Sequence, residues 1–239
     1  RDQKIGYHPG CSVLGLREGI AQVLTPAGVI SLPYDRLILA TGATDRLAPV
    51  PGWQMAGVYS LGATQIALKA QGVALGRRIV LAGSGPLLTL VAAQLIDAGA
   101  EVAAVLDTAP WRTQVRGGAR MALARPVFTL RGLRLRARLG HLYKAGVTLD
   151  SIEGDGTSPK AIIWRDARGR THRTECDTVA LGWHLRAETT LADLAGATFT
   201  WSQTWAQWLP RTDAAGRAAD ELYLAGDGMS LLGADGAEI

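Results

Sequence analysis

Three short, mostly apolar runs each end in a glycine-containing turn, and this pattern constrains the fold more than any other feature of the chain. The runs and their turns are Leu37–Ala40 before Thr41-Gly42, Arg78–Ala82 before Gly83-Ser84-Gly85, and Leu222–Ala225 before Gly226-Asp227. A short apolar run that ends at glycine is typical of a buried parallel strand. Turns that follow such strands lie at the carboxyl edge of the sheet, where open α/β folds bind ligands. The sequence therefore predicts an α/β protein.

The middle turn opens a strand–turn–helix–strand unit. Gly83 and Gly85 accept positive φ and let backbone N–H groups approach a pyrophosphate. Helical periodicity over Pro86–Ala98 follows at once, so the helix would point its positive N-terminus at that charge. Glu101–Leu106 reads as the next strand and ends at Asp107. The spacing predicts a nucleotide site at Gly83, Ser84, Gly85 and Pro86, with Asp107 accepting hydrogen bonds from an adenosine ribose.

Leu88 departs from the dinucleotide fingerprint, whose third glycine normally allows close packing of helix on strand. We expect this leucine to push the helix outward. Two interpretations stay open here: a working dinucleotide site, and a fold that has lost its nicotinamide role. If the site works, Asp107 should favour a ribose 2′-hydroxyl over a 2′-phosphate, unless Arg112 reverses that preference.

The first and last turns flank this unit and predict a second, split domain around it. Thr41, Gly42 and Ala43 follow one strand, and Gly226 and Asp227 follow the other. Asp227 could accept hydrogen bonds from the sugar-like chain of a flavin, or it could simply cap a turn. We predict a Rossmann-like nucleotide-binding domain over residues 55–181, inserted into an FAD-type domain over residues 1–54 and 182–239. Because no glycine-rich turn precedes Leu37, this outer domain is expected to be incomplete at its N-terminal side.

The remaining segments carry weaker secondary-structure signals. Short strands are expected within residues 11–40, a helix over Gly62–Gln71, a strand over Thr178–Leu181, and helices or loops over residues 109–146. Ala161–Trp164 and Thr171–Glu175 flank a turn and predict a hairpin. Ala48–Gly52 should be an extended crossing segment because it contains two prolines. Trp201, Trp205 and Trp208 have the spacing of one helix face and are expected to pack against the outer domain.

The charge is unevenly distributed, although the net charge is only +4. No Asp or Glu occurs from Thr108 to Lys144, a stretch that is rich in arginine. Nucleic-acid binding is not expected, since the stretch lacks interleaved aromatic residues for stacking. A solvated face or an acidic partner surface is the interpretation that we favour.

Cysteine, histidine and hydropathy patterns exclude several other classes. Cys11 and Cys176 are far apart, which argues against a disulfide framework, a redox pair or a cysteine-based metal site. The four histidines form no ligand motif, so no metal is expected. No apolar run approaches the roughly 18 residues that span a bilayer. These features favour a cytoplasmic protein that is not transmembrane.

The motifs, read together, resemble one branch of flavoproteins with two dinucleotide-binding domains. The segments ATGATDRLAPVPGW, GVYSLGATQIALKAQG, VLAGSGPLL and LYLAGDGMSLLGADGAE are similar to the larger subunit of opine oxidase, its hydrogen cyanide synthase counterpart and the α subunits of bacterial amino-acid dehydrogenases. In such families a glycine fingerprint precedes the residues present here, and a cysteine-rich iron–sulfur segment often follows them. The chain is therefore expected to be an internal fragment.

The resemblance also implies a function. Thr41, Gly42 and Asp227 would contact FAD, and Gly83 and Gly85 would face NAD(P) or another adenine nucleotide. The full protein would be a subunit of a flavin-dependent oxidoreductase that oxidises opines, amino acids or related secondary amines. It would pair with a smaller flavin-containing subunit and pass electrons between flavin and another carrier. The alternative is a non-catalytic module that holds a nucleotide and docks a catalytic flavin subunit.

Overall fold

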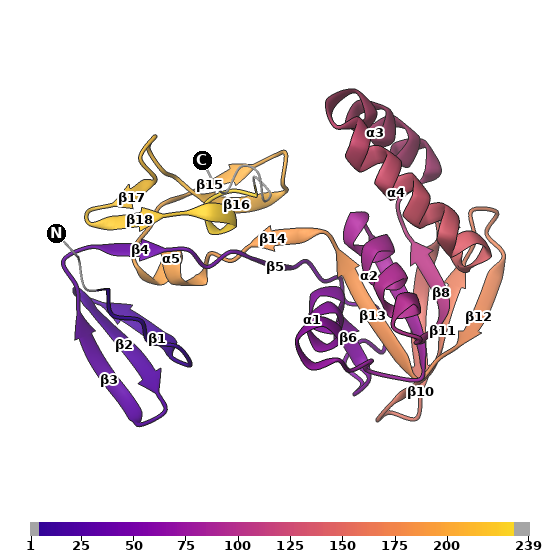
Figure 1. Ribbon diagram of the computed structural model, residues 1–239, viewed down its shortest axis with the longest axis horizontal. Coiled ribbons are helices and arrows are strands. Elements are labelled where there is room, and N and C mark those ends of the chain that lie inside the picture. Colours follow the sequence, from indigo (N-terminus) through magenta and orange to yellow (C-terminus); the bar gives the residue numbers. More distant parts are fainter. Residues whose placement is uncertain (1–4, 232–239) are drawn as a thin grey trace. The chain divides into compact units, whose positions relative to one another are not determined.

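The computed structural model describes residues 5–231, apart from the side chains of Arg120, Met121, Ala124 and Phe128. The chain divides into two compact units. The inner unit is continuous from Asp45 to Leu185, and the outer unit is assembled from the residues before and after it. The two crossings between the units, β5 (Ala43–Asp45) and β14 (Leu185–Ala187), pair with each other (Figure 1).

The inner unit is built on a five-stranded parallel sheet in the order β6-β13-β7-β8-β9. Its central strands are long apolar runs with few polar residues, as expected of parallel strands that are covered on both faces. Their bounds are β6 (Val58–Ser60), β13 (Thr178–Trp183), β7 (Arg78–Ser84), β8 (Glu101–Asp107) and β9 (Tyr143–Ala145).

Alternate side chains of β7 face two different cores. Ile79 and Leu81 join a cluster that includes residues of the helices, whereas Val80 and Ala82 join a cluster that includes Ile162 and Trp164. The helices are α1 (Leu61–Gln71), α2 (Pro86–Asp97), α3 (Trp111–Ala124) and α4 (Pro126–Leu139), with a short 3-10 turn η1 (Gly140–Leu142). A three-stranded antiparallel sheet contributes Ile152, Ile162 and Trp164 to the second cluster. Its strands are β10 (Thr148–Gly154), β11 (Pro159–Arg165) and β12 (Thr171–Glu175).

The outer unit contains several small sheets that do not share strands. In its central sheet β4 (Leu37–Leu39) pairs in parallel with β18 (Leu222–Leu224), which pairs antiparallel with β17 (Arg217–Ala219). A separate antiparallel sheet holds β1 (Ser12–Arg17), β2 (Ile20–Thr25) and β3 (Gly28–Pro33). The other elements are α5 (Thr190–Leu194), the hairpin β15 (Phe199–Ser202) and β16 (Gln207–Pro210), and η2 (Gly226–Gly228).

The prediction that Trp201, Trp205 and Trp208 lie on one face of a helix is wrong. Trp201 lies in β15 and Trp208 in β16, and the two residues face each other across the hairpin with ring centroids 5.8 Å apart. Trp205 lies in the connecting turn. All three indoles are exposed, so these residues do not form a buried helix face.

The crossing segment Ala48–Gly52 belongs to the inner unit, whose first residue is Asp45 and not a residue near Met55. Val50 is buried in the cluster with Ile152, and the backbone N–H of Ile152 donates to the carbonyl of Pro51 at 2.7 Å. The segment therefore packs along β10 rather than bridging freely between the units. Leu88, which we expected to displace α2, is fully buried in the apolar cluster beneath that helix.

Candidate functional site

The turn between β7 and α2 has the geometry that a phosphate group needs. Gly83 and Gly85 have φ of 145° and 105°, values that side-chain-bearing residues rarely adopt. A Cβ at Gly83 would collide with the carbonyl oxygen of Gly182 on β13. Helix α2 begins at Pro86, and no described side chain caps it. Its backbone donors and its positive dipole end are thus directed at the turn.

His184 borders the same turn, and the sequence analysis did not single it out. A Cβ on Gly85 would lie 2.8 Å from Nδ1 of its imidazole, so the ring lies directly beside the turn. His184 itself has φ of 65°, an unusual value for a residue other than glycine. Its backbone N–H donates to the carbonyl of Ser84 at 3.3 Å. The histidine follows β13, far from Gly85 in sequence, and no local motif marks it.

The carboxyl ends of β7, β8 and β13 are joined by hydrogen bonds. The carbonyl of Gly83 accepts from the backbone N–H of Thr108 at 2.7 Å and from its hydroxyl at 3.0 Å. That hydroxyl in turn accepts from the indole N–H of Trp183 at 3.0 Å. These bonds hold the turn in place at the carboxyl edge of the sheet, which preorganises it.

Asp107 lies where the sequence predicts, at the end of β8, but its carboxylate already has two partners. The side chain is only 5% exposed. One oxygen accepts from the backbone N–H of Ala109 at 2.8 Å, and the other accepts from the hydroxyl of Tyr143 on β9. Burial, together with the bond to Asp107, raises the pKa of Tyr143. In this arrangement Asp107 braces β8 against β9, and a ribose would have to compete with Tyr143 for it.

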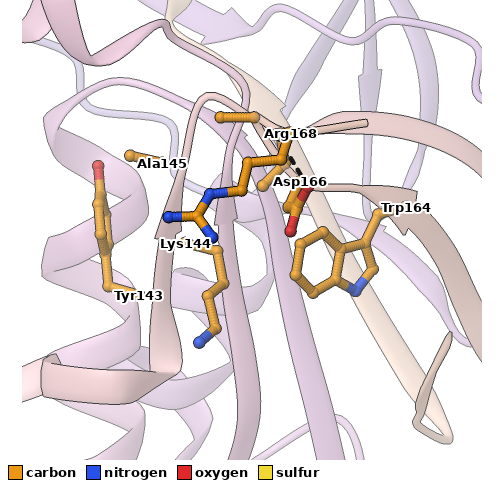
Figure 2. A pocket seen from close by; sticks show the side chains of 8 residues that line it. Tyr143, Lys144, Ala145, Trp164, Asp166 and Arg168 are labelled. Atoms are coloured by element: carbon orange, nitrogen blue, oxygen red, sulfur yellow. Dashed lines mark hydrogen bonds between the residues drawn. The ribbon is translucent and has the colours of Figure 1, made fainter. Parts of the chain in front are cut away.

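A pocket of about 250 Å³ has Tyr143 in its lining. Figure 2 shows Lys144 and Arg168 between the aromatic side chains of Tyr143 and Trp164. Asp166 also lines it. Burial acts to raise the pKa of that carboxyl, but hydrogen bonds from Arg170 and His172 lower it below its usual range. None of the residues predicted as sites from the sequence lines this pocket.

The outer unit brings its two predicted turns together. The hydroxyl of Thr41 donates to the carbonyl of Glu188 at 2.6 Å, and Gly42 has φ of 71°. A Cβ on Gly228 would lie 2.6 Å from the Thr41 hydroxyl, so η2 lies directly against the end of β4. Gly226 and Asp227 belong to η2, and Ala43 begins β5. The last part of the motif that begins at Leu222 extends beyond residue 231, outside the described residues.

The cysteines do not form a redox centre in the described part of the chain. Cys176 is buried in the core, and its burial, with the charge of Asp177, raises the pKa of the thiol to about 11. A thiol with such a pKa is protonated at neutral pH and is a poor nucleophile. Cys11 belongs to the other unit, and both thiols are free.

Curated relatives cover nearly the whole chain. It is 36% identical to an opine oxidase subunit of Rhizobium meliloti, over 98% of its length and 47% of that protein. It is 39% identical to the corresponding opine oxidase subunit of Agrobacterium tumefaciens (strain Ach5), over 94% of its length and 45% of that protein. Hydrogen cyanide synthase subunit HcnB of Pseudomonas aeruginosa is 33% identical, over 68% of the chain and 37% of that protein. The chain thus spans less than half the length of these relatives.

Solved structures support the fold. L-proline dehydrogenase from P. horikoshii superposes with a TM-score of 0.64 at 17% identity, over 92% of this chain and 36% of that one. An FAD-dependent pyridine nucleotide-disulphide oxidoreductase from Desulfovibrio vulgaris gives 0.62 at 18%, over 92% and 53%. Among the described residues, no helix is long and apolar enough to cross a membrane. A profile described as "Pyridine nucleotide-disulphide oxidoreductase" matches residues 3–233, and the chain therefore belongs to that family.

Proposed function

We propose that this chain is part of a flavin-dependent oxidoreductase subunit, in which the inner unit binds NAD(P) or another adenine nucleotide and the outer unit contributes to an FAD site. The observation that carries the proposal is the turn at Gly83–Pro86. Two glycines with positive φ, a close strand neighbour and an uncapped helix N-terminus occur there together. Family membership and the fold both support FAD and NAD(P) as the cofactors.

The inner turn fits a pyrophosphate better than a ribose. Backbone N–H groups at the start of α2 would bind the phosphates, and His184 would lie beside them. Asp107, in contrast, is held by Ala109 and Tyr143. We therefore assign phosphate binding to the turn, and we assign ribose recognition to Asp107 only if the nucleotide displaces the Tyr143 hydroxyl.

In the outer unit, Thr41, Gly42, Ala43, Gly226 and Asp227 are the residues proposed to hold FAD. The approach of η2 to Thr41 supports this assignment, because it brings both strand ends to one place. FAD, when bound, supplies the two-electron acceptor for the reaction. The protein's own part would be to position the cofactor and to exclude competing reactions.

The substrate class and the partner follow from the relatives. The opine oxidase relatives and HcnB are named as subunits, so we propose that the whole protein pairs with a smaller flavin-containing subunit. The substrates would be opines, amino acids or related secondary amines. Electrons would pass between the flavin and a second carrier.

A second candidate is a non-catalytic module that holds a nucleotide for assembly. The engagement of Asp107 by Tyr143 favours it, because a ribose hydrogen bond is then not available without rearrangement. Under this alternative the nucleotide would bind through its phosphates and would not exchange electrons with the flavin.

Titration of the chain with NADH, NADPH, ADP and ATP by calorimetry tests the nucleotide site. Binding that is lost in Gly85→Val and kept in Gly99→Val supports the proposal, since Gly99 has positive φ but open space around it. Absence of binding to all four would contradict it. Reduction of the flavin by NADH in the full-length protein, followed at 450 nm, then separates the redox function from the assembly module.

A further inference from the structure

Helices α3 and α4 form a hairpin in the connection between β8 and β9 (Figure 1). Leu139, at the end of α4, is fully buried in the core. The other described side chains of the hairpin are exposed or half-buried. Most of its surface is therefore not needed to close the core of the inner unit.

The hairpin is nevertheless fixed to the sheet. Gln114 on α3 accepts from Arg136 on α4 at 2.6 Å, and its Oε1 lies 3.2 Å from the Tyr143 hydroxyl oxygen. The guanidinium of Arg136 lies 4.4 Å from the centre of the Tyr143 ring. Arg138 pairs with Asp97 on α2. These contacts hold both helices in one orientation, so the exposed surface is preorganised for binding.

That surface carries large apolar side chains that nothing in the described chain covers. Val127 is 77% exposed, Leu130 49% and Leu133 59%, and Val115 and Leu123 on α3 are exposed as well. Single exposed leucines are ordinary, but several on one helical hairpin indicate a surface that another molecule covers.

Arginines share the same surface. Arg131 and Arg134 are four and seven residues after Val127, and Arg134 is four after Leu130, so they lie on one side of α4. We call Val127, Leu130, Arg131, Leu133 and Arg134 the α4 face. Within the described residues neither arginine has an ion-pair partner, whereas Arg165 and Arg173 of the same unit are paired with carboxylates. The stretch from Thr108 to Lys144 contains no carboxylate that could serve.

We propose that the α4 face docks an acidic, partly apolar surface of a partner protein, namely the smaller flavin subunit; this inference rests on the proposed function. Charge complementarity requires an acidic partner, because two unpaired arginines would meet carboxylates there. An anionic membrane is less suitable. A helix that lies in a membrane separates its apolar side from its cations, whereas on α4 the cations lie among the apolar residues.

The test co-expresses the full-length protein with the smaller flavin subunit, then measures the dissociation constant of the complex at low and moderate salt. Arg131→Glu/Arg134→Glu should weaken binding by about 100-fold, because two charges are reversed at the contact and its net charge changes by four units. Leu130→Ser/Leu133→Ser should weaken it by about 10-fold, the scale of lost apolar contact. The matched control is Lys69→Glu/Arg77→Glu, which makes the same charge change at exposed positions of the same unit and should alter binding by less than about 3-fold.

Four results would overturn the proposal. They are no complex with the wild-type protein, an unchanged affinity in both α4 double variants, an equal loss in the control, and binding to phosphatidylcholine–phosphatidylglycerol vesicles that the arginine variant abolishes. Calorimetry with NADH on the same proteins reports the proposed function separately. Lost complex with retained NADH binding supports docking at α4, whereas an intact complex without NADH binding contradicts only the nucleotide proposal.

Discussion

Gly83 and Gly85, in the turn between β7 and α2, belong to the same sequence motif but have different neighbours. A Cβ on Gly83 would meet backbone, the carbonyl of Gly182, while a Cβ on Gly85 would meet the exposed ring of His184, which can turn away. Gly83→Ala should therefore lower the free energy of unfolding by about 2–4 kcal/mol, because β7 and β13 must separate. Gly85→Ala should lower it by about 1 kcal/mol and weaken nucleotide binding by about 10-fold or more. Urea unfolding and calorimetry measure the two effects.

Gly99→Ala provides the control for backbone strain, since Gly99 also has positive φ but has open space around it. It should lower stability by about 1 kcal/mol and leave nucleotide binding unchanged. Equal losses of stability in Gly83→Ala and Gly99→Ala would show that the contact with Gly182 is unimportant.

Tyr143 should make stability depend on alkaline pH. Its pKa is raised in the folded protein, by burial first and then by Asp107, so the hydroxyl stays protonated while unfolded chains lose this proton above about pH 10. The unfolded state then binds fewer protons, and the free energy of unfolding falls as pH rises above about 10. Tyr143→Phe should remove part of that fall. It should also lower stability at pH 7 by about 1–3 kcal/mol, because Asp107 loses a buried donor.

Denaturant titrations at pH 8 and pH 10.5 measure this difference, and tyrosinate absorbance at 295 nm follows the hydroxyl directly. Tyr7→Phe is the control, since Tyr7 is exposed. A Tyr143→Phe protein that keeps the full alkaline loss would contradict the assignment.

For single residues, the spacing within one segment predicted which residues lie at the turn. Contacts between segments far apart in the sequence could not be predicted in this way. Gly83 and Gly85 follow from a local motif. Tyr143 and His184 reach the same region only through β9 and β13, which the parallel sheet places beside β8 and β7. Nothing in the sequence around Asp107 indicates that a tyrosine 36 residues later occupies its carboxylate.

At the scale of elements, the βαβ unit was predictable because every local signal agrees. The two apolar runs, the glycine turn and the helix that begins at a proline predicted the bounds of β7, α2 and β8 to within two residues. The hairpin of β11 and β12 followed in the same way. The tryptophans misled because spacings of four and three residues also arise when two strands flank a short turn. Their mutual register depends on pairing across the hairpin and not on one periodic segment.

The tryptophan hairpin yields a prediction of its own. Trp201 and Trp208 are opposite each other, with ring planes at 67°. A double-mutant cycle with Trp201→Ala and Trp208→Ala should give a coupling energy of about 0.5–1.5 kcal/mol, the usual value for an aromatic pair in edge contact. A coupling energy indistinguishable from zero would argue against the hairpin.

At the scale of the whole molecule, the inner unit should fold without the outer one. It is continuous in sequence, and both of its large clusters are drawn from residues between Val50 and Leu181. A protein of residues 45–185 should unfold in one cooperative transition and bind adenine nucleotides as the longer chain does. Circular dichroism during urea unfolding and calorimetry with NADH check both statements. A non-cooperative transition would mean that the outer unit is needed for the inner core.

The outer unit of this 239-residue chain should hold FAD only weakly. The described residues supply Thr41-Gly42 and Gly226-Asp227, which we propose to hydrogen-bond the isoalloxazine or its sugar-like chain. A diphosphate needs preorganised backbone donors at a helix N-terminus as well. The only α-helix of the described outer unit is α5, whose first-turn N–H at Thr190 already donates to Glu188. Purified chain mixed with FAD should therefore lose the flavin absorbance between 350 and 500 nm during gel filtration, with Asp227→Ala as the comparison. Stoichiometric retention that Asp227→Ala abolishes would show a complete flavin site in this chain, and the assignment of its diphosphate donors would then have to change.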